Sequence, residues 1–180
     1  NHRENVFHAA GDPEAYLDLL HAYGRREGLR VFAYCLMPNH VHLVVVPSSS
    51  DGMCRGLQAV HGQYAQRVNR MRKSVGHLWQ GRYWSSALDS DHFLNAVRYV
   101  ERNPVAAGLV ARAEQYRWSS AAAHCGMRED RLLEPAGHST ALSGISDWPS
   151  WLAREVPEEC RKLLRRNARL GLPCGSSEFI

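Results

Sequence analysis

Two apolar runs separated by only two residues constrain the fold more than any other feature of this chain. The first, Arg30–Met37, and the second, His40–Val46, are rich in the β-branched and aromatic residues that favour strands. So short a connection joins antiparallel neighbours. We therefore predict a β-hairpin over these two segments.

Two histidines open the second run. Side chains alternate along a strand, so His40 and His42 leave the same face, with their bases roughly 7 Å apart. Both imidazoles can then bind one cation, and histidine is the commonest metal ligand. A second interpretation stays open, in which the two rings are partly buried and only hydrogen-bonded, because two ligands alone do not complete a metal site.

A later segment places a tyrosine among polar side chains. We predict a helix that starts near Ser90 and, at about 100° per residue, presents one apolar face. That face carries Phe93, Ala96, Val97 and Val100. An adjacent polar stripe carries His92, Asn95, Tyr99 and Asn103. A tyrosine in such a position usually packs in the core with its hydroxyl in water, but its amide and imidazole neighbours favour a functional role.

The other predicted elements complete an α+β fold, an antiparallel sheet with helices packed on it. They are a helix over 13–27 capped by Asp12, a helix over 51–73, and a strand over 82–88. Residues 1–126 form one domain in this interpretation. Residues 127–180 form a loop and a helical C-terminal tail, with two short helices broken at Pro157.

Composition favours a compact intracellular protein. Hydrophobic residues make up 44% of the 180 residues and charged residues 22%, both ordinary for a globular domain, and the net charge of +4 permits phosphate binding. The five cysteines are scattered without a C-x-x-C pair, which favours a reducing cytoplasm over disulfides or structural zinc. No apolar run approaches the ~20 residues that cross a bilayer, so we expect no membrane association.

Basic side chains gather in three places that suit contacts with phosphates. The helix over 51–73 has no acidic residue after Asp51 and carries Arg55, Arg67, Arg70, Arg72 and Lys73. Arg82 follows, interleaved with Trp79, Tyr83 and Trp84, whose rings suit stacking on unpaired bases. Arg165 and Arg166 lie late in the tail. Structural explanations remain for each: an exposed face, core aromatics, and complementarity to the helix dipole.

Four segments in this order carry a resemblance to a known family: YCLMPNHVHLVVVP, HLWQGRYWSSAL, RYVERNPVAAGLV and YRWSSAAAH. From about Arg3 to His124, the chain resembles the REP-associated tyrosine transposases of the HUH single-tyrosine superfamily. The resemblance implies a ferredoxin-like HUH fold with a basic helical C-terminal extension. It also implies a central strand upstream of the sequence NHRENVF, so we expect residues before Asn1.

Each site residue of that family falls on a residue already singled out. The resemblance implies that His40 and His42 bind the metal, that Tyr99 is the nucleophile, and that Asn103 is a third ligand. The divalent metal implied is Mg²⁺ or Mn²⁺. A cation beside the scissile phosphate suits a tyrosine nucleophile, because a phenol with an ordinary pKa near ~10 attacks poorly at neutral pH.

The activity implied is metal-dependent nicking and strand transfer of single-stranded DNA, through a covalent 5′-phosphotyrosine intermediate. The substrate would be a hairpin formed by repetitive extragenic palindromes (REP), handled by a monomer at the bacterial nucleoid. The alternative is a domesticated relative that binds hairpins without cutting, although binding alone requires neither the histidines nor Tyr99. A relaxase or replication initiator shares the chemistry but fits the NPVAAGLV segment poorly. Since every implied catalytic residue precedes Pro104, we expect the tail to modulate DNA handling only.

Overall fold

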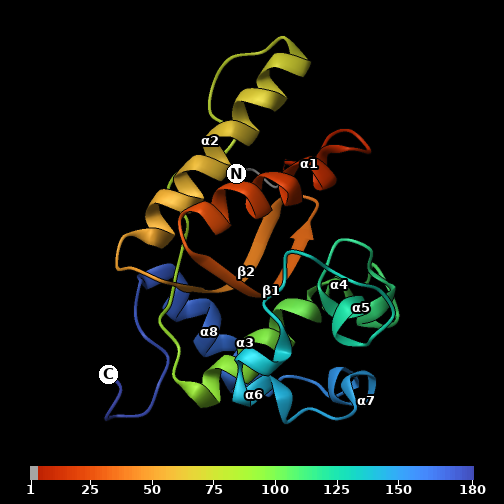
Figure 1. Cartoon of the computed structure of the whole chain (residues 1–180), viewed down its shortest axis with the longest axis vertical. Coiled ribbons are helices and arrows are strands. Elements are labelled where there is room, and N and C mark those ends of the chain that lie inside the picture. Colours follow the sequence, from red (N-terminus) through yellow and green to blue (C-terminus); the bar gives the residue numbers. More distant parts are fainter. Residues whose placement is uncertain (1–3) are drawn as a thin grey trace.

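A two-stranded antiparallel sheet lies between two layers of helices (Figure 1). The computed structural model describes residues 4–180. Strand β1, Leu29–Met37, pairs with β2, His40–Pro47, in a register that sets Met37 opposite His40 and Cys35 opposite His42. The predicted hairpin and the α+β class are confirmed.

One face of the sheet is covered by the first two helices. Helix α1, Asp12–Leu19, continues as a π-helix over Leu20–Gly24, and α2 spans Gly52–Arg72. Their buried side chains form one cluster with this face of β1: Tyr16, Leu20, Val31, Tyr34, Leu36, Val60, Tyr64 and Val68. Both helices match the sequence prediction.

The cap predicted for α1 is wrong. Gly11 occupies the N-cap position, and no side chain of residues 4–180 caps this end. Asp12 is buried instead, and its Oδ2 accepts hydrogen bonds from the backbone N–H groups of His8 and Ala9. The carboxylate therefore orders the chain that enters the helix and leaves the helical N–H groups to other partners.

Helix α3, Ser90–Glu101, covers the opposite face of the sheet. Its predicted apolar face is confirmed: Ala96, Val97 and Val100 are buried, and the ring of Phe93 packs edge-on against Phe32 of β1. Asp89 caps the helix, because its side chain accepts a hydrogen bond from the backbone N–H of His92.

The chain after α3 closes over the same face. It forms α4 (Asn103–Ala106), η2 (Ala113–Gln115), α5 (Ala121–His124), η3 (Ala136–His138), α6 (Thr140–Ser143), α7 (Trp148–Ala153) and α8 (Glu158–Leu170). The predicted break at Pro157 is confirmed, since α7 ends before it and α8 begins after it. Trp148, Leu152 and Leu164 share one hydrophobic core with α3. The tail is therefore packed into the molecule.

The two edges of the sheet differ. Along the outer edge of β1, Leu36 N–H donates to the carbonyl of Trp118, Ser120 N–H to Tyr34, and Glu134 N–H to Val31. These bonds satisfy an edge that is buried along nearly its whole length. The outer edge of β2 pairs with no other strand within residues 4–180. The upstream strand expected from the resemblance lies outside the described residues.

The strand predicted over 82–88 is wrong. Only Leu88 forms an isolated bridge, to Cys174, flanked by hydrogen bonds from Cys174 N–H to Ala87 and from Asp89 N–H to Cys174. Side chains of this segment are exposed or half-buried, so no face of it is buried as a sheet strand would require. All five cysteines are free, and across residues 4–180 no helix has the length and apolar character to cross a membrane.

Candidate functional site

The two histidines of β2 point at each other. Their Nε2 atoms lie 2.9 Å apart, and the rings meet edge to face with 4.6 Å between centroids. Asn39, in the hairpin turn, places its Oδ1 2.6 Å from Nδ1 of His40 and so orients that ring. The alternation of side chains along β2 and the contact with Asn39 therefore bring the Nε2 atoms of His40 and His42 together.

Tyr99 of α3 lies against His42. The ring centroids are 5.6 Å apart and the ring planes are nearly perpendicular. Asn103, one turn later and buried, hydrogen-bonds to His42 through its side chain, and its Nδ2 lies 3.3 Å from the backbone oxygen of Tyr99. These residues from β2, α3 and α4 form a single constellation.

The rest of the predicted polar stripe takes no part in this constellation. Nδ1 of His92 lies 2.7 Å from the capping carboxylate of Asp89, and Asn95 Nδ2 donates to the backbone oxygen of Asp91. Both side chains serve the helix itself. In this stripe His92 and Asn95 therefore stabilise the start of α3, whereas Tyr99 and Asn103 contact His42.

An arginine from the tail completes the surroundings of the tyrosine. Arg165 of α8 donates from Nε to the hydroxyl of Tyr99 at 3.0 Å, and its guanidinium carbon lies 5.6 Å from the ring centroid. One turn later, the Arg169 guanidinium lies 5.3 Å from the centroid of the exposed Trp84 ring. The structure thus does not support the expected separation between the tail and the chemistry.

The electrostatics of the site keep both imidazoles neutral. Burial, the neighbouring His40 and the Arg165 guanidinium lower the pKa of His42 to about 3, partly opposed by the hydrogen bond to Asn103. Burial and Arg165 also lower the pKa of His40. A neutral imidazole offers a lone pair, which is the form that binds a metal.

The donor set fits a divalent cation of modest affinity. Two nitrogens 2.9 Å apart can both bond one ion at about 2.1 Å, and the amide of Asn103 lies beside them. Within residues 4–180 no cluster of three or more His, Cys, Asp or Glu residues forms a metal-binding group. The candidate centre therefore rests on two imidazoles and an amide.

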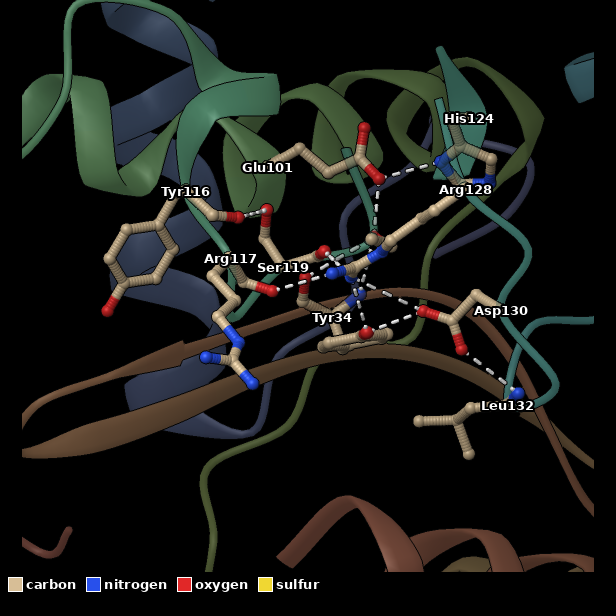
Figure 2. Close-up of polar contacts among 10 residues, drawn as sticks. Tyr34, Glu101, Tyr116, Arg117, Ser119, His124, Arg128, Asp130 and Leu132 are labelled. Carbon is tan, nitrogen blue, oxygen red and sulfur yellow. Dashed lines mark hydrogen bonds and ion pairs between the residues drawn. The ribbon is translucent and has the colours of Figure 1, made fainter. Parts of the chain in front are cut away.

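A buried carboxylate anchors α3 from the side away from Tyr99, and sequence reasoning missed it. Glu101 is fully buried and accepts a hydrogen bond from the hydroxyl of Ser120; its Oε1 also lies 2.6 Å from Nδ1 of His124 (Figure 2). The His124 ring stacks on Trp148 at 4.2 Å between centroids. The sequence did carry a signal for this role, because Glu101 follows Val97 by four positions and so lies on the buried face of the helix.

An arginine clamp fixes the segment that supplies Ser120. Arg128 donates from Nη1 to the backbone oxygen of Arg117 and from Nη2 to that of Ser119 (Figure 2). It also donates to the hydroxyl of Tyr34, which in turn donates to Asp130. This network holds the segment along β1 and so positions the groups that bind Glu101.

The side chains predicted to contact phosphates are spread over the surface. Arg55 is already paired with Glu27 and Asp51, and Arg72 lies 3.0 Å from Nε2 of His8. Exposed cations remain at Arg67, Arg70, Lys73, Arg82 and Arg166. The end of α2 that carries three of them extends away from α3 and α8 (Figure 1). It forms a basic surface separate from the tyrosine.

The aromatic residues beside Arg82 have different environments. Trp79 packs in the core beside Tyr16 and donates from its indole N–H to the backbone oxygen of His61. Tyr83 is half-buried. Trp84 is 66% exposed, which leaves it as the ring best placed to stack on a base.

Comparison with protein families gives one informative match. Residues 1–103 match the family model described as Transposase IS200 like, which is more than half of the chain. The matched segment ends at Asn103 and so contains both histidines and the tyrosine. Comparison with curated proteins and with solved structures finds no significant match.

Proposed function

We infer the function from one premise: the chain belongs to the family of IS200-like transposases, whose activity is DNA transposition. Its partner is therefore DNA. We propose that it nicks and rejoins single strands by HUH chemistry, as a monomer at the bacterial nucleoid. We propose REP-type hairpins as its substrate, because the four ordered segments resemble the REP-associated group of these enzymes.

The contact between His42 and Tyr99 carries the proposal, because it sets a nucleophile beside a candidate metal ligand. The oxygen of Tyr99 bonds to phosphorus while the bond from phosphorus to the 3′ oxygen breaks. The phenolic proton leaves to solvent, and the released 3′ oxygen takes up a proton. The tyrosyl 5′-phosphate retains the energy of the diester, so a second 3′-hydroxyl can reverse the step as strand transfer.

We propose that His40, His42 and Asn103 hold Mg²⁺ or Mn²⁺. When bound, the cation polarises the scissile phosphate and offsets the charge that develops on it. Asn39 orients the first imidazole through its carbonyl, and Asn103 fixes the second. Binding alone would require none of these arrangements, which favours catalysis over a hairpin-binding role.

A covalent adduct tests the proposal. Purified protein is mixed with REP hairpin that is labelled at its 3′ end and carries a single-stranded 5′ flank, in Mn²⁺ or Mg²⁺, and resolved under denaturing conditions. We expect a labelled band at the mass of the protein plus DNA, absent in Tyr99→Phe. Tyr116→Phe is the matched control, because its hydroxyl donates to the backbone oxygen of Leu36 and has no hydrogen bond to either histidine within residues 4–180.

Three outcomes would redirect the proposal. Tight hairpin binding without an adduct in the wild-type protein would identify the domesticated binding protein. An adduct that survives in Tyr99→Phe would show that another tyrosine is the nucleophile. Equal affinity for a blunt duplex of the same sequence would exclude the hairpin as the preferred substrate.

A further inference from the structure

Within the described residues Arg165 forms one hydrogen bond, and it goes to the proposed nucleophile. Its Nε donates to the hydroxyl of Tyr99 at 3.0 Å, whereas its Nη1 and Nη2 have no hydrogen-bond partner within residues 4–180. The side chain is exposed. Two donors of a planar fork therefore remain available beside the oxygen that attacks.

Among residues 4–180 no carboxylate pairs with Arg165, whereas the two cations in the preceding turn of α8 are paired. Arg161 pairs with Glu158 and Lys162 pairs with Glu159, each one turn earlier. No carboxylate within residues 4–180 forms an ion pair with Arg165, whose one side-chain hydrogen bond there goes to the neutral hydroxyl of Tyr99. An unpaired positive charge beside the Tyr99 hydroxyl favours the binding of an anion there.

Geometry places a phosphate within reach of the two free nitrogens. An oxygen attacks phosphorus from roughly 3 to 3.5 Å. The non-bridging oxygens of a phosphate at that distance from the Tyr99 hydroxyl lie beside the guanidinium that already contacts it. A guanidinium fork matches two phosphate oxygens better than any other side chain.

We propose that Arg165 is a catalytic residue supplied by the tail: it orients the Tyr99 oxygen through Nε and binds the scissile phosphate through Nη1 and Nη2. The inference rests on the proposed function and adds a group that lies outside the matched family segment. In the step, the Tyr99 oxygen bonds to phosphorus and the bond to the 3′ oxygen breaks. Arg165 keeps its proton throughout and stabilises the charge on the phosphate oxygens.

If Arg165 only blocked access to Tyr99, the same contact would be present, but removing Arg165 would raise the rate of adduct formation. The adduct rate is therefore measured under single-turnover conditions at saturating hairpin for Arg165→Ala, Arg165→Gln and Arg165→Lys. Loss of one such donor to a developing charge lowers a rate roughly 10²- to 10³-fold. We expect that loss in Arg165→Ala, a smaller loss in Arg165→Lys, and partial rescue of Arg165→Ala by added guanidinium ion.

A matched variant accounts for the change in net charge. Arg131→Ala removes the same side chain, but Arg131 pairs with Asp18 of α1, on the opposite face of the sheet from Tyr99. We expect its adduct rate to equal that of the wild type. An adduct rate in Arg165→Ala equal to or faster than the wild type would overturn the proposal. So would a loss that guanidinium ion does not restore and that coincides with a lowered melting temperature.

A binding measurement separates this inference from the proposed function. In a Tyr99→Phe background, which cannot form the adduct, each phosphate of the single-stranded flank is replaced in turn by a neutral methylphosphonate. We expect one position to weaken binding with Arg165 present and to have no effect in Arg165→Ala. If no position depends on Arg165, the proposed contact between Arg165 and the phosphate is wrong even where the wild-type protein forms an adduct. If one position does, this contact stands even where no adduct forms.

Discussion

Nδ1 of His124 lies 2.6 Å from Oε1 of Glu101, and this contact ties α5 to the helix that carries Tyr99. Glu101 and Tyr99 are two positions apart and so face nearly opposite sides of α3. Ser120, bound to the same oxygen, lies on the edge of β1. The carboxylate therefore fixes the end of α3 against the sheet while the tyrosine faces the histidines.

Replacing Glu101 tests this anchor. Glu101→Ala removes the carboxylate that faces the His124 ring and one of the two acceptors of the Ser120 hydroxyl, so we expect the free energy of unfolding to fall by about 3 kcal/mol. Chemical denaturation measures the change. Glu155→Ala, at an exposed position, is the control and should change stability by less than about 0.5 kcal/mol. A loss in Glu101→Ala no larger than in this control would contradict the anchoring role.

Removal of the imidazoles tests the candidate metal centre. The double variant His40→Ala/His42→Ala should lose calorimetric binding of Mn²⁺ and all adduct formation, while its melting temperature stays within a few degrees of the wild type. EDTA should stop the wild-type reaction, and Mn²⁺ should restore it. Ni²⁺, Cu²⁺ and Zn²⁺ should bind more tightly than Mn²⁺ to these donors.

The control for the metal prediction is His138→Ala. His138 is exposed and its Nδ1 lies beside Glu134, so its loss should not alter Mn²⁺ binding. A reaction rate that EDTA leaves unchanged would exclude a metal mechanism. Unaltered Mn²⁺ binding by the double variant would instead show that the metal binds at another site.

The basic end of α2 gives a prediction about salt. Each phosphate contact that releases a counterion contributes about 0.7 to 0.9 to the slope of log affinity against log salt. Replacing Arg67, Arg70 and Lys73 together by Gln should therefore reduce the slope for hairpin binding by about 2. Arg55→Gln should change it less, because Arg55 is already paired with Glu27 and Asp51. Equal slopes in the triple variant and the wild type would remove α2 from the DNA interface.

Local sequence pattern predicted the elements whose faces are sharply divided. Helices α2 and α3 each bury a regular stripe, so periodicity located them to within a few residues, whereas two apolar runs with a short connection located the hairpin, whose β1 is buried on both faces. The same pattern placed His42 on one face of a strand and Tyr99 on the polar stripe of a helix. Only the family resemblance joined them in one site, and the structure puts their ring centroids 5.6 Å apart.

Long-range partners were beyond the reach of local pattern. The segment 82–88 looks like a strand, but its backbone partners lie near Cys174, some 86 residues later. Arg165 and Tyr99 are 66 residues apart, and the exposed face of α8 gives no sign of that contact. Glu101 is an acid on an apolar stripe, a local conflict that only the distant Ser120 and His124 resolve.

His61 gives a prediction about pH. Its ring stacks on Trp79 at 4.4 Å between centroids, and burial lowers its pKa from 6.5 to about 4. Between these values the unfolded chain binds a proton that the folded protein does not, so stability falls as pH falls from 6.5 towards 4. The contribution is at most about 3 kcal/mol.

His61→Gln keeps a polar side chain near the Tyr16 hydroxyl but does not titrate. Its unfolding free energy, measured by denaturant titration at several pH values, should depend less on pH than that of the wild type over this window. His77→Gln, at an exposed position, serves as the control. Parallel curves for the wild type and His61→Gln would show that His61 titrates normally in the folded protein.

The docking of α8 gives the last prediction, because Leu164 is buried in the core beside the arginine that contacts Tyr99. Leu164→Ala should lower the free energy of unfolding by about 2 to 5 kcal/mol, as a large-to-small change in a core does. It should also slow adduct formation, because Arg165 then loses the packing that holds it on the tyrosine. Leu170→Ala, on the same helix but 60% exposed, should change neither quantity. A destabilised Leu164→Ala protein with a normal adduct rate under folded conditions would show that α8 docks for stability alone.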